Sequence, residues 1–174
     1  AGYLRESRKG AKRAQHIIIS KCPANLNPGL QDMYRKASKK YSAAPIHFSQ
    51  LEYGAIVNQF GNHLEAKQDL ALITAIANTQ TLEEMLSTKG ALKKHWQYRD
   101  HHPFTKQELE SHLAKAKKEK YSLVCTDKDW VKIKPLLAEI DPEYPVYRVP
   151  VKPKFSEQDR EVLLTDLNSL FSTV

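Results

Sequence analysis

The stretch Leu70-Ala71-Leu72-Ile73-Thr74-Ala75 is the most apolar run of the chain and decides its fold class. A short continuous apolar run that ends in polar turn residues is typical of a strand buried on both faces of a parallel sheet. Asn78 and Thr79 follow it as a polar turn, and Thr81 with Glu84 has the spacing of a capping box. The stretch therefore predicts one strand and the helix that follows it in a parallel sheet.

The same alternation of short strands and amphipathic helices continues along the chain. Strands are predicted at residues 16–20, 45–49, 91–98, 122–125 and 144–151, the last as an edge strand, and helices at 4–14, 28–41, 105–118, 130–140 and 156–171. Thr126 to Asp129 has the spacing of an N-terminal cap for the helix at 130–140. This pattern predicts an α/β fold, a layered sheet of mostly parallel strands with helices on both faces. At 174 residues we expect a single α/β domain, residues 1–174.

Composition excludes several classes of protein. A hydrophobic content of 41% and a charged content of 27% are ordinary for a soluble globular chain. The longest apolar candidate, residues 70–77, is far shorter than the 18 or more residues of a typical membrane span, so none is predicted. Two cysteines are too few for a disulfide framework or a thiolate zinc site, which favours a reducing compartment.

Charge points to an anionic partner without choosing one. The formal net charge of +7 is compatible with nucleic acid, phosphate or an anionic lipid surface. A helix at 4–14 would bring five cations onto one face, where like charges repel unless an anion compensates. An anion-facing surface and a merely solvated face both remain open. The five are Arg5, Arg8, Lys9, Lys12 and Arg13.

Candidate catalytic residues lie in the segment Asp100-His101-His102-Pro103-Phe104-Thr105, where a predicted strand stops. Histidine is the side chain whose ordinary pKa lies close to neutral pH, and a neighbouring carboxylate can orient it or hold its proton. This makes Asp100 and His101 candidates for proton-transfer chemistry. A structural role is the alternative, because Pro103 restricts His102 to extended geometry and Thr105 with Glu108 forms a capping box.

Two further sets of residues have side chains that bind ligands or metal ions in other proteins. Ser20 and Lys21 follow the first predicted strand, and loops at the carboxyl ends of strands bind ligands in open α/β sheets. They are therefore candidate binding residues, although a lysine at a strand end is often only solvated. The histidines lack the spacing of metal ligands, so no metal site is predicted; they include His95, His101, His102 and His112.

Five motifs, taken in order, resemble those of the tetraacyldisaccharide 4'-kinase family. They are Gly2-Tyr3-Leu4-Arg5-Glu6, the Ile-rich strand into Ser20-Lys21, Ala75-Ile76-Ala77-Asn78, the segment from Asp100 to Thr105, and Thr126-Asp127-Lys128-Asp129. The resemblance spans nearly the whole chain. It implies an enzyme of Gram-negative lipid A biosynthesis, which transfers the γ-phosphate of ATP to the 4'-hydroxyl of a tetraacylated disaccharide 1-phosphate. It also implies a cytoplasmic location, peripheral at the inner membrane.

A P-loop kinase needs a G-x-x-x-x-G-K-[ST] loop, and none of the six glycines begins such a pattern. In the family, the P-loop, the acidic magnesium ligands and the membrane helix precede the Gly-x-Leu-Arg-Glu motif with which this chain opens. The resemblance therefore implies a carboxyl-terminal half, P-loop-kinase-like but lacking the P-loop and inactive alone. The sites for ATP and Mg²⁺ would lie mainly in the missing amino-terminal half.

The resemblance also implies roles for the candidate residues. His101, beside Asp100, would pair with an aspartate from the missing half, which accepts the proton of the sugar hydroxyl. Ser20 and Lys21 would contact the nucleotide, since base recognition is common at that position in P-loop proteins. The five cations would contact the substrate phosphate or the anionic inner-membrane surface.

One competing hypothesis belongs to a different class. The charge of +7 and the predicted basic helix are also compatible with a stand-alone module that binds nucleic acid or anionic surfaces. The chain carries no recognisable motif for reading DNA or RNA, so we do not expect nucleic acid as a partner.

Overall fold

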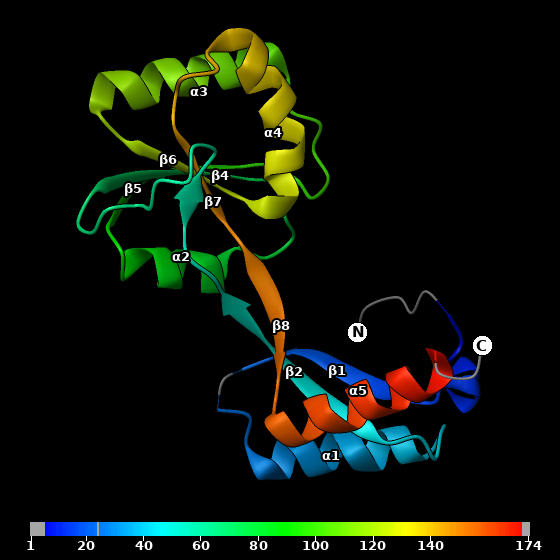
Figure 1. Ribbon diagram of the computed structural model, residues 1–174. Coiled ribbons are helices and arrows are strands. Elements are labelled where there is room, and N and C mark those ends of the chain that lie inside the picture. Colours follow the sequence, from blue (N-terminus) through cyan, green and yellow to red (C-terminus); the bar gives the residue numbers. More distant parts are fainter. Residues whose placement is uncertain (1–5, 24, 172–174) are drawn as a thin grey trace. The chain divides into compact units, whose positions relative to one another are not determined.

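The computed structural model describes residues 6–23 and 25–171 of the chain (Figure 1). The chain divides into two compact units, one made of Ala1–Glu52 with Lys152–Val174 and the other of Tyr53–Val151. A single domain is predicted from the sequence, whereas the contacts of the structure fall into these two units. Strands and helices alternate as predicted, and the fold is a mixed α/β fold rich in parallel strands.

The smaller unit contains a three-stranded sheet with the order β1-β2-β8. Its strands are β1 (Ile17–Cys22), β2 (Ile46–Tyr53) and β8 (Val151–Phe155), and its helices are η1 (Arg8–Arg13), α1 (Pro28–Lys39) and α5 (Glu157–Phe171). β1 and β2 are parallel, with Ile17 opposite Ile46, and α1 is the crossover between them. Asn27 caps α1 by accepting a hydrogen bond from the Gly29 N–H, which confirms the predicted start of this helix.

A chain of polar side chains fastens α5 to the sheet of the smaller unit. His47, which is 3% exposed, places Nδ1 2.7 Å from Asp159 Oδ1 of α5. His47 Nε2 lies 3.0 Å from His16 Nδ1, and His16 Nε2 lies 3.1 Å from Asp166 Oδ2. These hydrogen bonds hold α5, whereas its apolar side chains Val162, Leu164 and Leu167 stay 40–47% exposed.

The larger unit contains a five-stranded sheet with the order β3-β7-β6-β4-β5. Its elements are β3 (Val57–Asn58), β4 (Asp69–Thr74), α2 (Gln80–Ser87), β5 (Ala91–Gln97), α3 (Lys106–Glu119), β6 (Ser122–Thr126), α4 (Asp127–Ile140) and β7 (Val146–Val149). β4, β5, β6 and β7 are parallel, and β3 runs antiparallel to β7. The prediction of an edge strand at 144–151 is wrong, because the short strand β3 covers the outer side of β7.

β4 is the centre of the larger unit and is buried on both faces. Ala71 and Ile73 pack into a cluster with α3 and α4, whereas Leu70 and Leu72 pack into a second cluster with α2. Figure 1 shows α3 and α4 on one side of this sheet and α2 on the other. This confirms the prediction of helices on both faces, and it explains why the strand is continuously apolar.

Two of the three helix starts in the larger unit follow their predicted caps. Thr105 and Glu108 form a capping box at α3, and Thr126 accepts a hydrogen bond at the start of α4. The predicted capping box of Thr81 and Glu84 is wrong, because α2 begins at Gln80. Asn78 Oδ1 accepts a hydrogen bond from the Gln80 N–H at 3.0 Å, and this contact favours the earlier start.

The core of the larger unit contains a histidine that burial keeps neutral. His112 of α3 is 8% exposed, stacks on Trp96 at 4.3 Å between ring centroids, and has Nε2 2.6 Å from Tyr98 Oη. Burial lowers the pKa of His112 below its ordinary value. Below a pH of about 6.5, the unfolded chain binds a proton that the folded chain resists, and the free energy of unfolding falls.

We therefore expect wild-type protein to lose more stability between pH 7.5 and pH 5 than His112→Gln, because glutamine does not titrate. Urea unfolding of both proteins at several pH values measures the difference. Equal pH dependence in the two proteins would contradict the buried neutral state of His112.

Candidate functional site

The candidate site lies where the parallel strands of the larger unit end. The carboxyl ends of β4, β5 and β6 meet at one edge of the sheet, and ligands bind at this edge in open α/β folds. The loop after β4 begins at Ala75, the loop after β5 carries Asp100 and His101, and α4 follows β6 directly. Loops from three strands therefore border one surface.

A buried carboxylate holds this edge together. Asp129, in the first turn of α4, is 0% exposed. Its Oδ2 accepts hydrogen bonds from the Ala75 N–H at 3.0 Å and from Thr126 Oγ1 at 2.8 Å. Lys132 Nζ lies 3.4 Å from Asp129 Oδ1. Asp129 therefore joins the end of β4 to the end of β6.

His101 is presented to solvent by a strained backbone. Its φ of +64° lies in the left-handed region, which is uncommon for residues other than glycine. Its N–H donates a 3.2 Å hydrogen bond to the Ala75 carbonyl, and its side chain is 74% exposed. Backbone strain of this kind clusters at functional sites, where the surrounding structure must maintain it.

Asp100 and His101 share their surface with a lysine from α4. Lys128 Nζ lies 2.9 Å from Asp100 Oδ1 and 3.5 Å from His101 Nε2, and His101 Nε2 lies 3.7 Å from Asp100 Oδ2. The hydrogen bond from Lys128 lowers the pKa of Asp100 below its ordinary value. Asp100 is therefore held as a carboxylate beside the imidazole. From the sequence, Lys128 is predicted only to lie at the start of a helix, and its contact with Asp100 is not indicated.

His102 has a different environment from its neighbour. Its ring stacks on Tyr98 at 4.3 Å between centroids, and its Nε2 lies 3.1 Å from Glu108 Oε1. Its carbonyl accepts a hydrogen bond from Lys132 Nζ at 3.2 Å. His102 is thus packed into the loop, whereas His101 is available to a ligand.

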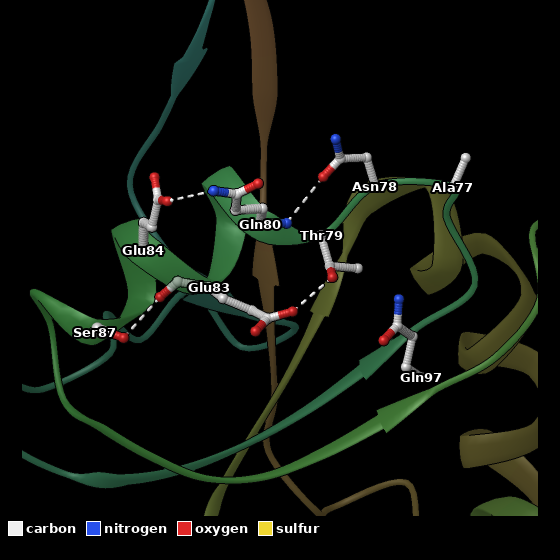
Figure 2. A pocket seen from close by; sticks show the side chains of 8 residues that line it. All are labelled: Ala77, Asn78, Thr79, Gln80, Glu83, Glu84, Ser87 and Gln97. Atoms are coloured by element: carbon white, nitrogen blue, oxygen red, sulfur yellow. Dashed lines mark hydrogen bonds between the residues drawn. The ribbon is translucent and has the colours of Figure 1, made fainter.

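A polar pocket opens at the start of α2, beside the end of β5 (Figure 2). Besides Ala77, its walls carry the amide, carboxylate and hydroxyl groups of Asn78, Thr79, Gln80, Glu83, Glu84, Ser87 and Gln97. Several are ordered by hydrogen bonds, including Thr79 Oγ1 to Glu83 at 2.5 Å and Gln80 Nε2 to Glu84 at 3.1 Å. Such a mixture of donors and acceptors suits a ligand rich in hydroxyl groups.

A histidine that the sequence analysis considered only as a metal ligand supports this pocket. His95 Nδ1 lies 3.2 Å from Glu83 Oε1, and His95 Nε2 lies 2.7 Å from Thr74 Oγ1. Burial lowers the pKa of His95 below its ordinary value. His95 therefore orients the Glu83 carboxylate without itself lining the pocket. No spacing in the sequence signals this contact, because it joins a strand to a helix across the sheet.

The other candidate residues lie in the smaller unit. Ser20 and Lys21 are the exposed residues near the end of β1, where the register with β2 shifts, and Lys21 has a φ of +59°. A cavity lies beside the end of the same strand and is lined by Cys22, Arg35 and Phe48, among others. Arg35 covers the Phe48 ring at 5.0 Å, which gives the cavity an aromatic and cationic wall.

The predicted basic helix is wrong for residues 8–13, which form the 3₁₀ helix η1, and Arg5 lies outside the described residues. With three residues per turn, a 3₁₀ helix does not align cations at i, i+3, i+4 and i+7 on one face. Arg8 Nη1 lies 3.3 Å from Tyr41 Oη, and Arg13 pairs with Glu6 at 3.6 Å. Lys9 and Lys12 are three residues apart and therefore share one face of the 3₁₀ helix, whereas Arg8 and Arg13 lie on the other two.

The described part of the chain has neither a metal-binding cluster nor a membrane-spanning helix. Between residues 6 and 171, leaving out residue 24, no group of three His, Cys, Asp or Glu side chains is placed to hold a metal ion. The helices in that part of the chain also lack the length and apolar character that a membrane span requires.

Comparisons with known proteins show which family the chain resembles. A family model described as LpxK, tetraacyldisaccharide-1-P 4'-kinase, matches residues 1–169. The tetraacyldisaccharide 4'-kinase of Cytophaga hutchinsonii is 32% identical over 168 residues, which cover 95% of this chain and 47% of the relative. The enzyme of that name from Phocaeicola vulgatus is 27% identical over 179 residues, covering 96% of this chain and 49% of the relative.

Among solved structures, the "apo" form of LpxK from Aquifex aeolicus in complex with ATP shares the fold, with a TM-score of 0.52 and 15% identity. The match covers 90% of this chain and 43% of that one. The chain therefore spans about half the length of the relatives it matches.

The left-handed backbone at His101 leads to a stability prediction. His101→Ala and His101→Gly both remove the imidazole, but only glycine adopts a φ of +64° without strain. We expect the glycine variant to be more stable by about 1 kcal/mol. Denaturant unfolding measures the difference.

Glu110, an exposed residue inside α3, serves as the control position. There the order should reverse, with Glu110→Gly less stable than Glu110→Ala by about 1 kcal/mol. An alanine variant that is the more stable at both positions would show that the backbone of His101 is not strained.

Proposed function

The chain belongs to the tetraacyldisaccharide-1-P 4'-kinase family, and we propose that it forms the carboxyl-terminal portion of an ATP-dependent kinase of lipid A biosynthesis. The reaction transfers a phosphoryl group to the 4'-hydroxyl of a tetraacyldisaccharide 1-phosphate. The observation that carries the proposal is the presentation of His101, an exposed imidazole on a strained backbone at the carboxyl edge of a parallel sheet. The names of the relatives supply the substrate class.

In this proposal His101 acts by orienting a proton acceptor. The imidazole hydrogen-bonds to an aspartate from the amino-terminal half, and that aspartate accepts the proton of the attacking hydroxyl. Asp100 lies beside the ring and keeps its own charge because Lys128 holds it. A positioned acid or base contributes about 10²- to 10⁴-fold to a rate, and phosphoryl transfer otherwise depends on positioning and charge stabilisation.

The phosphates of ATP and the Mg²⁺ ion do not fit the residues described for this chain. The sequence contains no G-x-x-x-x-G-K-[ST] loop for phosphates, and the described residues offer no cluster of carboxylates for a metal. We therefore assign the phosphate and magnesium sites to the amino-terminal half. Ser20 and Lys21 are proposed to contact the nucleotide base.

The remaining contacts follow from the chemistry of the substrate. The polar pocket of Figure 2 offers amides and carboxylates for sugar hydroxyls. The basic residues near the amino terminus are proposed to meet the substrate phosphate or anionic headgroups at the cytoplasmic face of the inner membrane. They are Arg5, Arg8, Lys9, Lys12 and Arg13.

The proposal predicts that this chain alone does not turn over ATP, whereas a protein joining it to an amino-terminal half with a P-loop has 4'-kinase activity. In the joined protein we expect His101→Ala to lower kcat by about 10²- to 10⁴-fold. Radiolabelled phosphate transfer to the disaccharide measures both. His63→Ala, at another exposed histidine of the larger unit, is the matched control. ATP turnover by the chain alone, or full activity of His101→Ala, would contradict the proposal.

The alternative function, binding of nucleic acid, is favoured only by the net charge of +7. Such binding would weaken by about 0.9 log units per phosphate contact for each tenfold increase in salt on duplex DNA. We expect no saturable binding of duplex or single-stranded oligonucleotides near 150 mM salt. Tight binding with a steep salt dependence would favour the alternative.

A further inference from the structure

The first two turns of α4 face the loop that carries His101. Lys128, Asp129 and Lys132 all contact segments at the carboxyl edge of the sheet. Asp129 is explained by its buried hydrogen bonds to Ala75 and Thr126, whereas the contacts of the two lysines extend to the loop. The two lysines contact the residues immediately before and after His101. This arrangement lies outside the reaction steps proposed above.

Lys128 fixes the residue before His101. Its Nζ donates to Asp100 Oδ1 at 2.9 Å and lies 3.5 Å from His101 Nε2. Asp100 Oδ2, an acceptor that would favour a hydrogen on Nε2, lies farther from that nitrogen, at 3.7 Å. A lysine ammonium has only donors, so a hydrogen bond from Lys128 requires a lone pair on Nε2. Nε2 then carries no hydrogen, and the hydrogen of the neutral ring is on Nδ1.

Lys132 fixes the residue after His101. Its Nζ donates to the His102 carbonyl at 3.2 Å, lies 3.4 Å from Asp129 Oδ1, and covers the Phe104 ring at 5.6 Å. The side chain is 28% exposed, so these contacts are better shielded from solvent than those of Lys128 at 44%. Lys132 thereby connects the buried carboxylate to the backbone of the loop.

The His101 ring itself has few constraints of its own. Its side chain is 74% exposed, and its backbone is held by one hydrogen bond to the Ala75 carbonyl. Its orientation therefore depends on whether its neighbours are fixed. Exposed ion pairs such as that of Lys128 and Asp100 add little to global stability, which leaves orientation as their main effect.

From these contacts we propose that Lys128 and Lys132 are positioning residues for His101, with Lys128 selecting the ring tautomer and Lys132 fixing the loop. The proposal deepens the proposed function and rests on it for its catalytic consequence. A misplacement of about 1 Å in a catalytic group can cost about 10²-fold in rate, so two lysines that do not touch substrate can still control turnover.

The first test uses this chain alone and needs no activity. Nitrogen-15 NMR of the imidazoles at alkaline pH should show the hydrogen of the His101 ring on Nδ1 in the wild-type protein. In Lys128→Met the hydrogen should move toward Nε2, whereas Lys128→Arg, which retains a cationic donor, should keep it on Nδ1. Lys134→Met, at an exposed lysine of the same helix, is the control and should match the wild type. An unchanged tautomer in Lys128→Met overturns the role of Lys128.

The second test uses the joined kinase. Lys128→Met and Lys132→Met should each lower kcat about tenfold or more while the KM for ATP changes little, and Lys134→Met should leave both unchanged. Lys128→Arg should recover most of the lost rate. Urea unfolding of each variant, together with the amide spectrum of the loop, identifies a variant that has lost its fold rather than its loop geometry.

The outcomes separate the two proposals. If the joined wild-type protein lacks kinase activity but the tautomer still depends on Lys128, the proposed function fails and the positioning of the ring stands. If the joined protein is active and both methionine variants are folded and as active as Lys134→Met, the positioning proposal is overturned while the proposed function stands.

Discussion

The edge of the larger unit depends on the buried carboxylate of Asp129. A fully buried charge without partners costs several kcal/mol, so the donors around it stabilise the folded unit. Those donors come from Ala75 after β4, from Thr126 at the end of β6, and from Lys132 one turn along α4. Satisfying one side chain therefore fixes the ends of two strands and the start of a helix together.

From this constraint follows the contrast between two neighbouring histidines. Lys132, which pairs with Asp129, also binds the His102 carbonyl, and His102 then packs between Tyr98 and Glu108. With that residue fixed, the backbone at His101 is left in a left-handed conformation with its ring in solvent. A loop backbone fixed on both sides of His101 needs little reorganisation to present the ring to a partner, which is the general advantage of a preorganised site.

The local parts of this structure could be predicted from sequence, and the non-local parts could not. The apolar run of β4, the Asn27 cap and the capping box of Thr105 depend on neighbours within a few residues, and all three predictions were confirmed. The start of α2 was misplaced because Asn78, which was assigned to a turn, also binds the Gln80 N–H. The prediction of β7 as an edge strand failed because its partner β3 has only two residues, too few for a recognisable sequence pattern.

The site shows the same division more strongly. Its segment Asp100-His101 was found from residue type and position after a strand, but the sequence placed Asp129 only in the first turn of a helix. The hydrogen bond from the Ala75 N–H to Asp129 joins residues 54 positions apart, and the contact of Lys128 with Asp100 joins residues 28 positions apart. Contacts of this kind become visible only when the strands have been placed side by side.

Net charge was the least informative signal, and the structure gives the physical reason. Several lysines and arginines have local tasks: Lys117 pairs with Asp141 at 2.6 Å, Lys115 with Glu119 at 2.7 Å, and Arg8 contacts Tyr41. A cation engaged in this way contributes to the formal charge but is less available to a polyanion, and its field is weakened by its partner. For this chain, the formal net charge therefore overstates the positive charge that a polyanion would meet.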